Sequence, residues 1–272
     1  MKILFFCTYW GSEHLKWTDF LTRVKKSGYD GVEFSLPHNA VSQANMISAI
    51  HDFGLQWIGV HWDTITPNFP QHKKEMTERL LTLSAAKPLF ITSHTGKDHF
   101  SFRQNIALLS AAQEISNATG ISILHETHRG KFSFAAHYTQ AFLKELPELL
   151  LTLDISHWFS VAESYLEDQN DALELALSRT RHIHSRIGFT QSPQVNDPRN
   201  IVWKEALQQH LKHWDKVVAM RIAEKADYFT FTSEFGPFPY MQWSPDGKSN
   251  ETHQWEINEY MKELLKNRYY VQ

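Results

Sequence analysis

The chain has 272 residues, of which 42% are hydrophobic and 13% aromatic, and its formal net charge is −3. This composition excludes an intrinsically disordered chain, and the low net charge without a cluster of Lys and Arg disfavours nucleic acid as the main partner. Cys7 is the only cysteine, which excludes an intrachain disulfide framework. The length suits one domain over residues 1–272, because a (β/α)8 barrel takes about 250 residues.

Short β-rich runs alternate with longer amphipathic stretches along the whole chain. We expect strands at 2–8, 30–35, 56–61, 88–93, 121–126, 149–154, 181–186 and 228–234. We expect helices at 14–27, 40–53, 70–86, 103–118, 134–146, 167–178, 200–214 and 252–267. Most of the strands are apolar on both faces, as strands covered by helices are. The pattern predicts an α/β protein with a single (β/α)8 TIM barrel, and a doubly wound open sheet is the alternative.

The turns between these elements agree with this prediction. Gly28, Gly54 and Gly120 each stand between a helical stretch and a strand, where a helix end favours a left-handed residue. No stretch approaches the roughly 18 apolar residues of a membrane span, and residues 2–8 form too short an apolar run for a signal sequence. We therefore expect a cytoplasmic protein.

Several predicted strands end on a residue that can bind a metal ion. Glu126, Asp154 and Glu234 offer carboxylates, and His184 offers an imidazole. The carboxyl ends of the strands meet at one face of a barrel. These side chains should therefore converge on one divalent ion, which could be Mn, Mg, Co or Zn. The alternative is that they are polar strand ends that bond to loop amides or to arginines such as Arg186.

Further side chains should face the same end of the barrel. His157 lies just after the sixth strand, and His61 and His94 each end a strand. His182 alternates with His184 along one strand, so it should fill a deeper layer of the barrel. The residues that we expect to bind substrate are His157, His61, His94, Arg186, Trp10, Lys97 and His128.

These motifs, in this order, resemble the xylose isomerase-like barrels, and in particular the sugar phosphate isomerase/epimerase family. The resemblance spans residues 3–238. It is carried by a second-strand signature, an Asp-x-x-His segment, a His-x-His strand and a final Glu-containing strand. In this chain they are Gly28-Tyr29-Asp30-Gly31-Val32-Glu33, Leu153-Asp154-Ile155-Ser156-His157, His182-Ile183-His184 and Ser233-Glu234-Phe235-Gly236.

The resemblance implies one divalent ion bound by Glu126, Asp154, His184 and Glu234. It also implies that Glu126 and Glu234 act as acid and base on opposite faces of a sugar. They would exchange a proton on a carbon next to a carbonyl, through an enediolate. His157 would bond to a substrate hydroxyl.

The chain departs from the family after His184, where Ser185-Arg186-Ile187-Gly188 replaces a turn that contains Gly and Glu. This departure leaves the substrate open. Arg186 could bind a carboxylate or phosphate of the substrate, or it could pair with Asp154.

The metal-dependent abasic-site endonucleases share this barrel and use strand-end histidines, such as His61 and His94 here, in a cluster of several ions. The Asp-x-His pair of those enzymes is replaced by Asp197-Pro198-Arg199. A phosphoester hydrolase is therefore the second candidate, and a sugar-binding barrel without catalysis is the third. We expect a small polyhydroxy substrate and no membrane partner. We also expect a homodimer, because dimers are the commonest oligomers of soluble proteins.

Overall fold

The computed structural model describes residues 1–241 and 251–269. Parallel strands form a closed barrel in which each strand pairs with its neighbours in chain order. The last strand closes the ring against the first, where Phe5 lies opposite Phe231. The strands are β1 (Lys2–Thr8), β2 (Gly31–Phe34), β3 (Gln56–His61), β4 (Ile91–Ser93), β5 (Ile123–Glu126), β6 (Leu151–Leu153), β7 (Thr180–His184) and β8 (Tyr228–Ser233).

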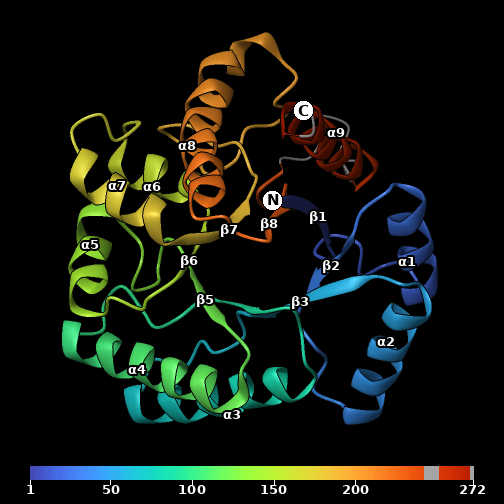
Figure 1. Cartoon of the computed structure of the whole chain (residues 1–272), viewed down its shortest axis with the longest axis horizontal. Helices are drawn as coiled ribbons and strands as arrows, with labels where there is room; N and C mark the ends of the chain where they lie inside the picture. The colour runs from blue at the N-terminus through green and yellow to red at the C-terminus, as the bar shows by residue number, and fades with distance from the viewer. Residues whose placement is uncertain (242–250, 270–272) are drawn as a thin grey trace.

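Helices surround the barrel and follow one another around it in chain order (Figure 1). They are α1 (Trp17–Lys26), α2 (Ala40–Asp52), α3 (Phe69–Ala85), α4 (Phe102–Thr119), α5 (Ala136–Glu145), α6 (Ile155–Ala162), α7 (Asn170–Arg179), α8 (Lys204–Ala223) and α9 (Glu251–Tyr269). The predicted barrel is confirmed, and the open sheet is excluded. Within the described part of the chain, no helix is both long enough and apolar enough to cross a membrane.

The alternation of side chains along the strands creates two apolar layers. On β1, Ile3 and Phe5 face the helices and belong to the core between helices and sheet. Leu4 and Phe6 face the barrel interior. There they form a separate buried cluster that consists of Leu4, Phe6, Ile58, Phe90 and Leu124. This cluster fills the lower interior, so the barrel is a packed core with no channel through it.

Polar residues continue the inward-facing rows above this apolar cluster. On β5, Glu126 stands two residues after Leu124 and therefore faces the same way. On β7, Ile183 packs in the outer core, which turns His182 and His184 inward. The polar site therefore lies above the apolar cluster, at the carboxyl ends of the strands.

Candidate active site

Buried carboxylates and histidines gather at the carboxyl ends of the strands. Glu126 ends β5, His184 ends β7, and Glu234 follows β8 directly. His184 Nδ1 lies 3.0 Å from Glu234 Oε2 and 3.5 Å from Glu126 Oε1. The side chains of Glu126 and His184 are each 1% exposed, whereas that of Glu234 is 15% exposed. Three residues predicted as metal ligands therefore meet at one point.

Glu33 on β2 holds this histidine from the opposite side. Its carboxylate lies 3.0 Å from Nε2 of His184 and 3.3 Å from Nε2 of His182. A carboxylate on one ring nitrogen orients the other nitrogen toward a ligand. Glu33 was predicted only as part of the second-strand signature, and its contact with the two histidines was not predicted. Its position between outward-facing Val32 and Phe34 was the signal that could have revealed it.

The charges of these residues depend on one another. Burial lowers the pKa of His184, but Glu234, Glu33 and Glu126 outweigh burial and raise the pKa well above its ordinary value. Burial raises the pKa of Glu126, yet His94 and His184 hold it well below its usual range. His94 Nε2 lies 2.5 Å from Glu126 Oε2. Glu126 is therefore ionised, and a metal ion bound by His184 would have to displace a proton.

The donor set fits a divalent metal ion. Ligand atoms of Glu126, His184 and Glu234 all lie within 4.8 Å of one another. His184 Nδ1 is buried, and none of its contacts has the geometry of a hydrogen bond. This is expected of an atom that points toward a metal site. A mixed set of carboxylates and imidazole suits Mn, Mg, Co or Zn. Two other groups have comparable spacing among the described residues, namely Glu33 with His182 and His184, and Glu126 with His128 and His157.

Asp154, the fourth predicted ligand, is engaged elsewhere. Arg186 Nη2 donates to Asp154 Oδ2. The backbone N–H and the hydroxyl of Ser156 donate to Asp154 Oδ1 at 3.0 and 2.5 Å. Burial raises the pKa of Asp154 to about 6, although the charge of Arg186 acts in the opposite direction. The pairing with Arg186 that the sequence left open is thus present, and Asp154 lies outside the described groups with metal-binding spacing.

Arg186 brings hydrogen-bond donors into the site. Its side chain is 2% exposed and lies 3.8 Å from Glu234 Oε2 and 4.6 Å from the ring centre of Tyr240. Nη2 also lies 2.8 Å from His157 Nε2. Because a guanidinium only donates, His157 Nε2 must accept, and the ring proton sits on Nδ1. Arg186 Nε and Nη1 and His157 Nδ1 are buried donors without a partner, so they are available to a substrate.

His61 does not face the barrel mouth, contrary to the prediction. It shares the outward-facing row of β3 with Trp57, which packs against the helices. Its ring nitrogens lie 2.8 Å from Ser93 Oγ and 2.7 Å from Thr64 Oγ1, and the side chain is fully buried. Burial lowers the pKa of His61 well below its ordinary value. The residue is a neutral, hydrogen-bonded part of the framework and does not contact the cluster.

His94 and His128 lie at the rim as predicted. The ring of His128 lies between those of His94 and His157, with centroids 4.7 and 3.9 Å apart. His128 Nδ1 donates to the Arg129 carbonyl over 2.6 Å, which leaves Nε2 as an acceptor. Burial lowers the pKa of His128 to about 3, so the imidazole is neutral. This stack forms one wall of the site.

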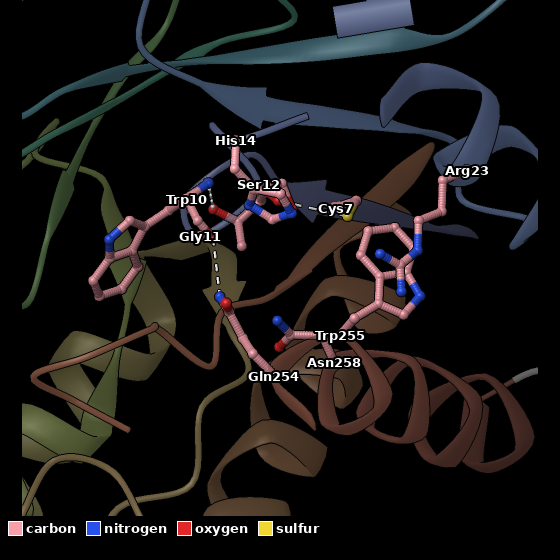
Figure 2. Close-up of a pocket in the computed structure, with 10 residues that line it drawn as sticks. Cys7, Trp10, Gly11, Ser12, His14, Arg23, Gln254, Trp255 and Asn258 are labelled. Carbon is pink, nitrogen blue, oxygen red and sulfur yellow. Dashed lines mark hydrogen bonds between the residues drawn. The ribbon is translucent and has the colours of Figure 1, made fainter. Parts of the chain in front are cut away.

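Trp10 packs at the rim against the loop after β8. Its ring lies 5.3 Å from that of Tyr240, and a Cβ on Gly236 would come within 2.2 Å of it. Figure 2 shows the indole turned away from a small cavity between the β1 end and α9, which Gln254 and Asn258 line. This cavity of about 70 Å³ has room for water but is too small for a sugar.

A wider pocket of about 300 Å³ lies on the outer side of the barrel, against α3. Asp63 and Arg79 line it, but none of the predicted site residues does. Lys97, the remaining predicted substrate residue, is half-buried in the loop after β4.

Known structures share this architecture over nearly the whole chain, although no family model and no curated protein matches. The probable 3-DHS dehydratase AsbF from Bacillus anthracis is 16% identical, with a TM-score of 0.62 over 98% of this chain and 100% of that one. The 3-keto-D-glucoside 4-epimerase YcjR from E. coli is 13% identical, with a TM-score of 0.61 over 96% and 99%. A sugar phosphate isomerase/epimerase from Parabacteroides distasonis is 14% identical, with a TM-score of 0.60 over 98% of both chains. The chain has the xylose isomerase-like barrel fold.

Two further known structures have this fold. A xylose isomerase-like protein from Mycobacterium smegmatis in complex with magnesium is 12% identical, with a TM-score of 0.56 over 92% of this chain and 88% of that one. Endonuclease IV from Thermus thermophilus is 12% identical, with a TM-score of 0.55 over 97% and 99%. At these identities the likeness concerns the fold, so the function has to be argued from the site.

Proposed function

We propose that this protein is a divalent-metal-dependent isomerase or epimerase that acts on a small sugar, sugar phosphate or related polyhydroxy compound. The observation that carries the proposal is the meeting of two carboxylates, Glu126 and Glu234, around the buried Nδ1 of His184. Such a set can hold an ion and also transfer protons, because each carboxylate has a second oxygen.

Glu126, His184 and Glu234 would hold the ion, and Glu33 would orient His184. Asp154 was expected as a fourth ligand, but we assign it to Arg186, whose charge it neutralises. A bound divalent ion would polarise a substrate carbonyl and lower the cost of an enediolate.

The chain's own residues supply the remaining chemistry. Glu126 is kept ionised by His94 and His184 and can accept a proton from the carbon next to a carbonyl. Glu234 stands across His184 and can return a proton to the other face of the substrate. Arg186 and His157 offer buried N–H groups that would orient hydroxyl or carbonyl oxygens. Low exposure of the cluster keeps water from competing for these protons.

The related folds support this assignment by what their names state. One is a probable dehydratase, one an epimerase acting on a 3-keto glucoside, and one a sugar phosphate isomerase/epimerase. Proton removal next to a carbonyl is the chemical step that isomerisation, epimerisation and dehydration of keto sugars have in common.

Phosphoester hydrolysis is the second candidate, supported by the endonuclease IV fold and by the group formed by Glu126, His128 and His157. A cluster of several ions would need more ligands than this, and His61 is turned away from the mouth with both nitrogens bonded. We therefore rank hydrolysis below proton transfer.

The test is solvent exchange with a panel of ketoses, keto glucosides and their phosphates in deuterium oxide. The wild-type protein, loaded with manganese, should incorporate deuterium at the carbon next to the carbonyl of at least one compound. Glu234→Gln should lose about 100-fold or more of this exchange, because general acid–base groups contribute at that scale. Glu148→Gln, an exposed change at the opposite end of the barrel, is the control. Undiminished exchange in Glu234→Gln would show that the assigned role is wrong.

A further inference from the structure

Lys131 is a nearly buried lysine whose ammonium has no direct partner. It stands in the loop after β5, is 7% exposed, and its ammonium makes no hydrogen bond or ion pair with any residue that the structure describes. Lysine normally buries its stem and leaves the ammonium in water, because an uncompensated buried charge is costly. Arg186, the other buried cation of this barrel end, is neutralised by Asp154. Lys131 has no such ion pair, and the carboxylates of Glu126 and Asp98 act on its charge only from beyond ion-pair distance.

A second lysine lies beside it because two loops are bonded together. The backbone N–H of Asp98 in the loop after β4 lies 3.4 Å from the carbonyl of Gly130, and that of Phe132 lies 3.3 Å from the carbonyl of Thr95. These contacts flank Lys97 on one loop and Lys131 on the other. Burial and the charge of Lys97 lower the pKa of Lys131 to about 8, although the charges of Glu126 and Asp98 act in the opposite direction.

The loop that carries Lys97 is held in place. Asn105 on α4 accepts from the backbone N–H of Lys97 at 3.3 Å and donates to its carbonyl at 2.9 Å. Gly96 has φ +65°, and a Cβ there would come within 2.2 Å of Asn105 Oδ1, so only glycine allows this approach. The arrangement of the two lysines is therefore built into the fold, as a binding site requires.

We propose that Lys131 and Lys97 bind an anionic group of the substrate, either a phosphate or a carboxylate. The ammonium groups act as point charges, which suit either anion. Both lysines follow strands that end at the proposed proton-transfer site, so the anion would fix the far end of the substrate. That the anion belongs to the substrate rests on the proposed function, whereas anion binding itself does not.

The experiment measures binding of inorganic phosphate and of malonate to the full chain by calorimetry and by thermal unfolding. We expect at least one of the two anions to bind and to raise the Tm of the wild type. Lys131→Met should weaken that binding by about tenfold or more, while its Tm without anion stays equal to or above that of the wild type. Lys131→Arg should restore binding, and the exposed change Lys144→Met should leave it unaltered.

The two anions distinguish the sources, because phosphate binding indicates a phosphorylated substrate and malonate binding an acid. Glu234→Gln should bind the anion like the wild type, so loss of proton exchange and loss of anion binding are separable failures. The proposal is overturned if neither anion binds to the wild type, or if Lys131→Met binds it equally well.

Discussion

At the scale of single residues, Glu33 orients His184, the histidine that we propose as a metal ligand. It accepts from Nε2 of both His182 and His184, and these two histidines outweigh burial and hold the pKa of Glu33 below its usual range. A charged carboxylate in that place fixes the ring of His184 and makes Nδ1 a stronger donor to a metal. We regard Glu33 as a positioning residue.

Glu33→Gln should therefore weaken metal binding by about 10–100-fold, as loss of a carboxylate behind a histidine ligand does. The measurement is competition with a chelator of known affinity, with Glu148→Gln as the control. Far-UV circular dichroism should be unchanged, because glutamine keeps the size of the side chain. An affinity within about twofold of the wild type would contradict the positioning role.

At the scale of elements, the pairing of the loops after β4 and β5 depends on Gly96. Gly96→Ala places a methyl group on Asn105 Oδ1 at a left-handed residue, whereas Gly120→Ala meets nothing within 4 Å at φ +72°. Gly120→Ala should thus lower the free energy of unfolding by about 1 kcal/mol from backbone strain alone. Gly96→Ala should lower it by about 2–3 kcal/mol, because the Asn105 bonds are also lost. Urea denaturation measures both, and equal losses would show that the Asn105 contact is unimportant.

The period of the sequence was enough to predict the strands and most of the helices. The eight expected strands all occur, with ends that differ by a few residues. For example, the strand expected at 149–154 is limited to Leu151–Leu153. Helix α6 was not predicted as a separate element, since it starts directly at the strand end with Asp154 as its N-cap.

The site was only partly predictable, for reasons of geometry. The expectation that polar residues at strand ends converge identified Glu126, His184 and Glu234. It could not distinguish side chains that face the barrel interior from those that face the helices, and His61 was therefore placed wrongly. Lys131 stands in a loop, where no periodic pattern of hydrophobic residues indicates which side chains are buried.

At the scale of the whole molecule, closure of the barrel brings these distant residues together. Glu33 and His184 are 151 positions apart, yet they meet because β2 and β7 face each other across the interior. The apolar cluster below, which includes Phe6 and Phe90, fixes the height at which the polar layer begins. A metal site that is assembled from separate strands should exist only in the folded chain, so metal binding should also stabilise the fold.

The most direct test of the central claim is the metal content of the purified full chain, measured by elemental analysis after dialysis against manganese. We expect one ion per chain in the wild type and in Asp154→Asn, and a loss of most of it in His184→Ala. Two or three ions per chain would favour the hydrolase, whereas no ion in the wild type, or full retention in His184→Ala, would contradict the proposed metal site.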